Sequence, residues 1–155
     1  MYFTGADLLN LDAKGRLMMP TAHRDALVEL CNGELMITRH WMEKKCLLVL
    51  PMPKWNQVLN EIIGNPTFDK TTQMTMRLIL GNAKPVKLDS NNRILIPPNL
   101  REAVGLEKAV QLMGLGEKFE LWPGVEIESV ENDWYDKVQN MDLDKIPEHI
   151  KKLAL

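Results

Sequence analysis

The sequence repeats itself at a fixed offset, and this repeat constrains the fold more than any other feature. Residues 11–26 read LDAKGRLMMPTAHRDA, and residues 88–103 read LDSNNRILIPPNLREA. The segments align without a gap, 77 positions apart, and share six identical pairs: Leu11/Leu88, Asp12/Asp89, Arg16/Arg93, Pro20/Pro97, Arg24/Arg101 and Ala26/Ala103. Such an internal repeat predicts two copies of one supersecondary unit.

Each copy extends beyond the aligned segment. ELMITR at 34–39 resembles AVQLMG at 109–114, and CLLVLP at 46–51 resembles FELWP at 119–123. Apolar stretches alternate with turn and helix signals, which predicts strand, tight turn, strand, short helix, strand, turn, strand in each copy. We therefore expect four segments: a first module at 5–52, a helical connector at 53–80, a second module at 81–124 and an acidic helical tail at 125–155.

The first turn of each copy has clear local signals. Asp12 suits the first turn position, and Gly15 suits a backbone with positive φ. In the second copy Asn92 replaces Gly15, and asparagine is among the residues that best tolerate such a backbone. Pro20 and Pro97 are expected to end the second strand and to open the short helix, because proline donates no ladder hydrogen bond and fits the first helical turn.

The connector between the two copies has helix signals instead of strand signals. Pro53 is placed to open a helix through WNQVLNEIIG, and a second helix is expected at about 69–80. The apolar residues of the first helix recur at helical spacing and predict one buried face: Trp55, Val58, Leu59, Ile62 and Ile63.

The net charge of −2 is unevenly distributed. Residues 117–148 contain ten acidic and three basic residues, which leaves a net charge of +5 on the rest of the chain. The acidic stretch can be read as one solvated helical face. A basic body with an acidic tail is also compatible with a nucleic-acid partner.

No set of residues indicates catalysis, a metal or a cofactor. Cys31 and Cys46 lie apart beside apolar residues and are expected to be packing residues. His23, His40 and His149 lack metal-ligand spacing and are expected to be surface or packing residues, and the ten methionines to fill the core. No apolar run reaches the roughly 18 residues of a membrane span, and the N-terminal stretch lacks the basic cluster of a secretory signal. We expect a cytoplasmic protein that is not an enzyme, with no cofactor, no metal, no membrane contact and no small-molecule substrate.

The two repeated motifs carry a family resemblance. The segment DAKGR at 12–16, followed by LMMP, resembles the DxxGR motif of the MraZ family of bacterial transcriptional regulators. The segment DSNNR at 89–93, followed by ILIPP and LREAVGLEK, resembles the second MraZ motif. The resemblance covers roughly residues 1–140. The second motif departs from the family pattern, because the family usually keeps a glycine where Asn92 stands.

The resemblance implies an α+β fold. Each copy would be an AbrB-like (SpoVT-AbrB) module, a swapped-hairpin β-barrel, and the two modules would pack as a pseudo-dimer with connecting and C-terminal helices. Subunits would assemble into a closed homo-oligomeric ring. The implied function is sequence-specific binding of double-stranded DNA at short G-containing direct repeats. The protein would act mainly as a repressor of the division and cell-wall gene cluster and of its own promoter, and it would associate with the nucleoid.

The chemistry of the first motif is compatible with that function. A two-stranded ribbon is thin enough for the major groove, and the guanidinium fork of Arg16 matches O6 and N7 of guanine. Lys14 is a point charge suited to phosphate, and Gly15 shapes the turn. Asp12 would repel phosphate, so we expect it to bond backbone N–H groups of the turn or to orient Arg16.

In the second motif Asp89 is expected to support the turn, and Arg93, Asn91 and Asn92 to approach DNA. We expect a smaller contribution than from the first motif, because Asn91 replaces the lysine. Arg24 and Arg101 lie on the short helices, where phosphate contact and a structural salt bridge are both compatible with the sequence.

Besides an enzyme, for which no convergent set of acid, base and nucleophile is seen, one other functional class remains, a structural or interaction protein. The same modules could serve only to oligomerise, or to bind a partner protein as an antitoxin-like component without an operator of its own. A DxxGR sequence is also simply a good hairpin turn.

Overall fold

The computed structural model describes residues 1–65 and 69–155. These residues form two compact units, Met1–Val125 and Glu126–Leu155. Both copies of the repeat lie in the first unit.

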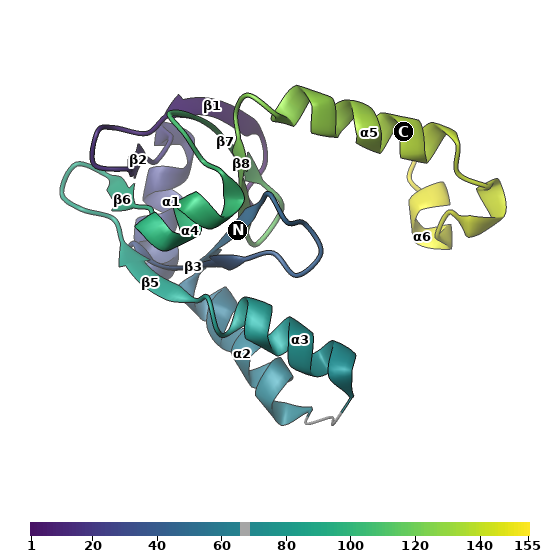
Figure 1. The fold of residues 1–155 in the computed structure, drawn as a ribbon, viewed down its shortest axis with the longest axis horizontal. Helices are drawn as coiled ribbons and strands as arrows, with labels where there is room; N and C mark the ends of the chain where they lie inside the picture. Colours follow the sequence, from purple (N-terminus) through teal and green to yellow (C-terminus); the bar gives the residue numbers. More distant parts are fainter. Residues whose placement is uncertain (66–68) are drawn as a thin grey trace. The chain divides into compact units, whose positions relative to one another are not determined.

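The predicted order of elements is present in both copies (Figure 1). The first copy contains β1 (Ala6–Asn10), β2 (Arg16–Met18), α1 (Thr21–Cys31), β3 (Glu34–Arg39) and β4 (Leu47–Pro51). The second copy contains β5 (Lys84–Lys87), β6 (Arg93–Leu95), α4 (Pro98–Val104), β7 (Ala109–Gly114) and β8 (Phe119–Pro123). The connector contains α2 (Met52–Gly64) and α3 (Lys70–Ile79).

The two copies exchange their first strands. The main sheet has the order β1-β7-β8-β4-β3-β5, so β1 of the first copy pairs with β7 of the second, and β5 of the second pairs with β3 of the first. Both exchanged pairs are antiparallel. Neither copy has a complete sheet alone, which confirms the expected swapped arrangement of two modules in a pseudo-dimer.

A pseudo-two-fold axis relates the copies. The second strands, β2 and β6, form a separate antiparallel ribbon in which Leu17 lies opposite Ile94. These residues occupy equivalent positions of the repeat. In the main sheet β4 pairs with β8, and Leu48 lies opposite Glu120, again an equivalent pair when the strands are aligned on their final prolines. The axis therefore passes through the centres of both pairings.

The core lies between the ribbon and the main sheet. Leu17 and Ile94 are fully buried and belong to one hydrophobic cluster with residues of the sheet, among them Leu47 and Leu121. Truncating a core leucine of this kind to alanine costs about 2–5 kcal/mol of stability. The ribbon is thus held from its inner face by both copies at once.

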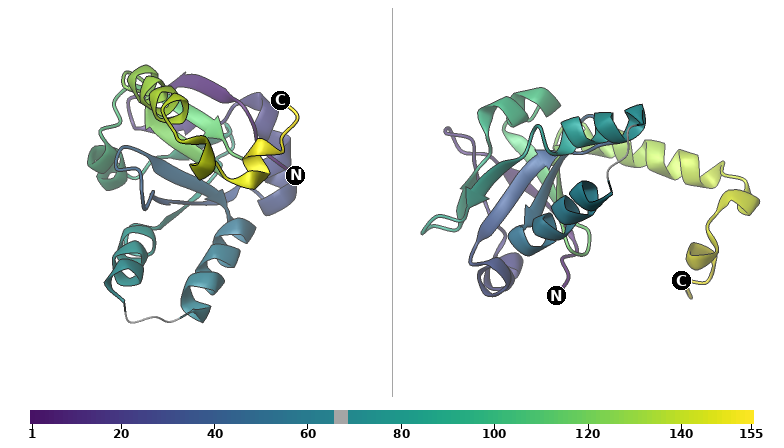
Figure 2. Two further views of the ribbon diagram at one scale, coloured as in Figure 1. Left: turned by 90° about the vertical axis from the view of Figure 1, so that its right-hand side faces the viewer. Right: turned by 90° about the horizontal axis from the view of Figure 1, so that it is seen from below.

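The connector helices pack on β3, which Figure 2 shows as a layer on one side of the strands. Trp55 and Ile79 are buried in a second cluster with Leu48 and Leu50, and Val58, Leu59 and Ile62 pack against it. The prediction for Ile63 is wrong, because this side chain is 60% exposed near the end of α2. Residues 66–68 of the predicted connector lie outside the described residues.

A buried carboxylate marks the axis in the main sheet. Glu120 accepts a hydrogen bond from Trp122 Nε1 at 3.0 Å, and its Oε2 lies 3.3 Å from His40 Nε2. His40 Nδ1 in turn accepts the backbone N–H groups of Met42 and Glu43 at 3.0 and 3.1 Å. His40 is therefore part of a polar network rather than a simple surface or packing residue.

The second unit is helical. It contains α5 (Ile127–Gln139), a short 3-10 helix η1 (Leu143–Lys145) and α6 (Glu148–Lys151). This agrees with the helical stretches expected after residue 124. Among the described residues no helix is both long and apolar enough to cross a membrane.

Candidate nucleic-acid interface

The β2–β6 ribbon has one inner and one outer face. Leu17 and Ile94 point inward and are fully buried. Because side chains alternate along a strand, the residues on either side of them share the outer face. On β2 these are Arg16 and Met18, and on β6 they are Arg93 and Leu95. The outer face thus carries both repeated arginines.

Asp12 organises the turn that precedes Arg16. Its Oδ1 accepts the backbone N–H groups of Lys14 and Arg16 at 3.0 and 2.9 Å. Its Oδ2 accepts Nε of the Arg16 side chain at 2.6 Å. One carboxylate therefore holds the turn and orients the guanidinium at the same time.

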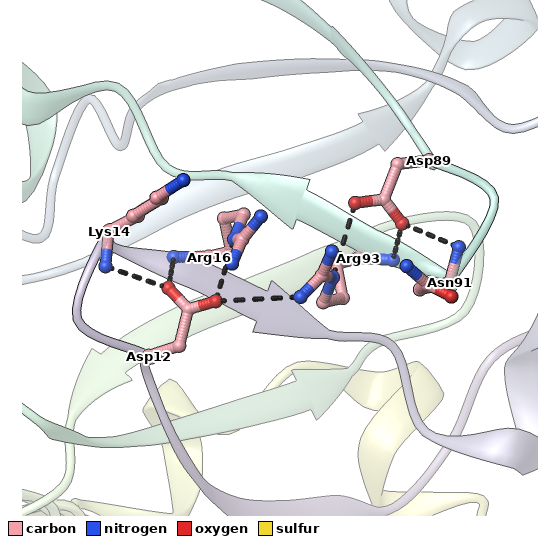
Figure 3. Close-up of polar contacts among 6 residues, drawn as sticks. All are labelled: Asp12, Lys14, Arg16, Asp89, Asn91 and Arg93. Carbon is pink, nitrogen blue, oxygen red and sulfur yellow. Dashed lines mark hydrogen bonds and ion pairs between the residues drawn. The ribbon is translucent and has the colours of Figure 1, made fainter.

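Asp89 makes the same set of contacts in the second copy. Its Oδ1 accepts the backbone N–H groups of Asn91 and Arg93 at 2.8 and 2.9 Å, and its Oδ2 accepts Arg93 Nε at 3.2 Å. Figure 3 shows the two turns at opposite ends of the ribbon, with both arginines between the two carboxylates. With Asn92 where the first turn has Gly15, the second turn keeps the same hydrogen-bond pattern, although the distance from Asp89 to Arg93 Nε is longer than the 2.6 Å of the first turn.

The hydrogen bonds lower the pKa of both carboxyl groups. The pKa of Asp12 is lowered most by the hydrogen bond from the backbone N–H of Arg16. The next largest lowering cause is the hydrogen bond from the Arg16 side chain. For Asp89 the largest cause is the backbone N–H of Arg93. Each donor favours the charged form, so both carboxylates are ionised at neutral pH.

The two arginines are close to each other across the axis. Nη1 of Arg93 lies 3.9 Å from Oδ2 of Asp12, the same oxygen that binds Arg16 Nε (Figure 3). Asp12 therefore lies near both guanidinium groups. The outer face presents the two cations as one cluster rather than as two separate charges.

The turns are also fixed to each other by backbone hydrogen bonds. The N–H of Met19 donates to the carbonyl of Asn92 at 2.8 Å, and the N–H of Ile96 donates to the carbonyl of Gly15 at 3.0 Å. Each turn is thus bonded to the strand end of the other copy. This reciprocal pair sets the position of both arginines relative to one another.

Gly15 and Asn92 both adopt a left-handed backbone, with φ of +79° and +61°. Gly15 is buried, because the guanidinium of Arg101 lies over the position where a Cβ would stand. Arg24, the residue of the first copy that is equivalent to Arg101, donates from Nε to the carbonyl of Met19 at 2.7 Å. Neither arginine forms one of the salt bridges found among the described residues.

The remaining predicted site residues are on the turns. Lys14 and Asn91 are both exposed and occupy equivalent positions. Lys14 adds a positive charge to the first turn that the second turn does not have. Residues 1–65 and 69–155 contain no group of three or more His, Cys, Asp or Glu side chains that could hold a metal ion.

One feature of this face differs from the sequence-based expectation. Residue type alone places the methionines in the core, but Met18 is 50% exposed, and Leu95 at the equivalent position is 49% exposed. The period of two around buried Leu17 and Ile94 is the signal that could have identified them.

Comparison with known proteins also finds two copies of one unit in the chain. A family model described as "MraZ protein, putative antitoxin-like" matches residues 2–78 and again residues 79–149. The chain belongs to the MraZ family. The two matches divide the chain between the two copies, as the repeat does.

Individual MraZ relatives match over most of their length. "Transcriptional regulator MraZ" of Halorhodospira halophila is 40% identical over 153 residues, 99% of both chains. The protein of the same name from Saccharophagus degradans is 36% identical over 154 residues, 99% of both chains. That of Delftia acidovorans is 47% identical over 120 residues, 77% of this chain and 81% of the relative. These MraZ relatives carry the name of a regulator, not of an enzyme.

Proposed function

We propose that this chain is a sequence-specific DNA-binding transcriptional regulator that reads guanine through the β2–β6 ribbon. The observation that carries the proposal is the pair of arginines on the outer face of the ribbon, each held by its own turn aspartate. The relatives named as transcriptional regulators support the same reading.

The geometry suits base recognition. Each aspartate binds Nε, and the terminal Nη groups of Arg16 and Arg93 form the end of the fork that meets O6 and N7 of guanine. Because the arginines are already oriented by their aspartates, less side-chain entropy is lost on docking. Lys14 at one end of the ribbon is suited to a phosphate, and Arg101 beside Gly15 is a second candidate.

Affinity requires more than one chain. A ribbon with two arginines and one turn lysine neutralises few phosphates, so its electrostatic contribution is small. When several ribbons of one assembly bind several repeats at once, the overall affinity rises through avidity without any new contact. This requires that the spacing of the repeats matches the spacing of the ribbons. We therefore propose a homo-oligomer, a closed ring, on short G-containing direct repeats. The proposed role is repression of its own promoter and of a division and cell-wall gene cluster, in the cytoplasm at the nucleoid.

The second candidate is an antitoxin-like protein that binds a partner protein. The description of the family includes the words "antitoxin-like", which supports this second candidate. In that case the modules would mediate association and have no operator.

Fluorescence anisotropy with the DNA upstream of its own gene separates the two candidates. The regulator is expected to bind this duplex more tightly than a shuffled duplex of equal composition, and to lose affinity steeply as salt rises. Equal affinity for the two duplexes would contradict sequence-specific regulation and leave the partner-binding candidate.

A further inference from the structure

The face that carries the two arginines also carries two apolar side chains exposed to solvent. Met18 and Leu95 are each about half exposed, although their neighbours Leu17 and Ile94 are completely buried. They occupy equivalent positions of the two copies. The apolar pair is therefore a repeated feature of the outer face and not an isolated exposed residue.

Each apolar side chain lies directly opposite an arginine. The ribbon register pairs Arg16 with Leu95 and Met18 with Arg93. Directly opposite residues have Cβ atoms about 4.5–5.5 Å apart. Successive bases of B-DNA are about 3.4 Å apart along each strand. An arginine and the apolar residue opposite it therefore reach the same base pair or adjacent ones.

We infer that Met18 and Leu95 read the C5-methyl groups of thymines next to the guanines that Arg16 and Arg93 contact. This inference rests on the proposed DNA-binding function and adds a second base to each recognition element. In the major groove thymine presents a methyl group that apolar side chains contact, and no other unmodified base offers one. The alternation of arginine and apolar side chain on the ribbon fits a guanine beside a thymine.

The charge of this face favours DNA over a second copy of the chain. On the outer face and its turns three cations, Arg16, Arg93 and Lys14, outnumber the two carboxylates of Asp12 and Asp89, so two copies placed face to face would both be positive there. Like charges brought together at an interface oppose association. DNA offers negative charge and guanine acceptors to the arginines, and thymine methyl groups in its major groove to the apolar pair.

Replacing thymine by uracil tests the inference, because it removes the methyl group and keeps the hydrogen-bonding pattern. The probe is the duplex from upstream of the gene, made once with thymidine and once with deoxyuridine throughout. The wild-type protein is expected to bind the uracil duplex about fourfold more weakly for each thymine methyl group that Met18 or Leu95 touches. The double variant M18A/L95A is expected to bind both duplexes with the same affinity.

A matched variant controls for the loss of two exposed apolar side chains, and a uracil effect that comes from DNA stiffness would persist in M18A/L95A. Leu8 on β1 and Met74 on α3 are 68% and 54% exposed and lie outside the ribbon, so L8A/M74A is expected to keep the wild-type sensitivity to uracil. Equal wild-type affinity for the two duplexes, or a uracil effect that persists in M18A/L95A, would overturn the inference. Failure of the proposed function is a different result, namely that the thymine duplex and a shuffled duplex bind equally.

Discussion

Leu17 of the first copy and Ile94 of the second are equivalent residues of the repeat, and they lie directly opposite each other in the β2–β6 ribbon. Both are fully buried, so the centre of the ribbon is fixed to the core at the pseudo-two-fold axis. As a result Arg16 and Arg93, one residue before each of them, are held at symmetric positions. The outer face of the ribbon is therefore positioned by the packing of the two copies and not by a flexible loop.

The left-handed backbone at Gly15 leads to a prediction about stability. Gly15→Ala is expected to destabilise the protein by about 1–2 kcal/mol, because φ of +79° is strained for a residue with a Cβ. Gly15→Asn is the matched variant and is expected to cost less, since Asn92 has φ of +61° in the equivalent turn. Both variants displace the flexible guanidinium of Arg101, so the comparison isolates the backbone. Urea denaturation measures the difference, and equal losses would contradict it.

The charge difference between the turns leads to a second prediction. We expect Arg93→Ala to weaken operator binding less than Arg16→Ala, because the second turn has Asn91 where the first has Lys14. Asn91→Lys is expected to raise affinity and to steepen the dependence of log affinity on log salt by about 0.9 per added phosphate contact. Anisotropy titrations at several salt concentrations measure both effects. An equal or larger loss at Arg93 would mean that the ranking of the two turns is wrong.

The lowered pKa of Asp12 and Asp89 predicts where the turns become sensitive to pH. A carboxyl whose folded pKa lies below its unfolded value of about 3.9 stabilises the fold above that value and loses this contribution as pH falls through the folded pKa. The turns are therefore expected to be independent of pH near neutrality and to loosen only in acid. An NMR titration of the side-chain carboxyl carbons is the measurement, and a pKa at or above about 3.9 for Asp12 would contradict the geometry.

The proposed assembly predicts a dependence on operator spacing. We expect light scattering of the free protein to report a homo-oligomer larger than a dimer. Widening the gap between two repeats by about 5 bp turns one of them to the opposite face of the duplex. The second repeat should then contribute little unless the DNA bends. A monomer that binds a single repeat with full affinity would contradict this proposal.

The elements of the first unit are well predicted from the sequence, because their signals are local. Asp12 and Gly15 identify the turn, and Pro20 separates the strand from the helix. The exchange of β1 and β5 between the copies follows from the family resemblance, since no local pattern specifies that β1 pairs with β7 across about 100 residues.

The errors also have physical causes. Ile63 follows the helical period but lies at the end of α2, beyond the cluster that Trp55 and Ile79 form. Glu120 stands within the apolar segment FELWP, and no sequence pattern identifies its partners, which the structure shows to be His40 and Trp122. Residue type places Met18 in the core, although the three-residue strand around Leu17 turns it outward.

The proposed contact between Arg16 and guanine is best tested by comparing Arg16→Ala with Arg16→Lys on the upstream duplex. Lysine keeps the charge but lacks the planar fork. Arg16→Ala is expected to cost about 1–3 kcal/mol of binding free energy per engaged subunit while the fold survives. Arg16→Lys is expected to lose most of the preference for the upstream duplex over a shuffled one and to keep the salt-dependent, non-specific binding. Correctly folded variants with unchanged affinity and preference for the upstream duplex would contradict the account.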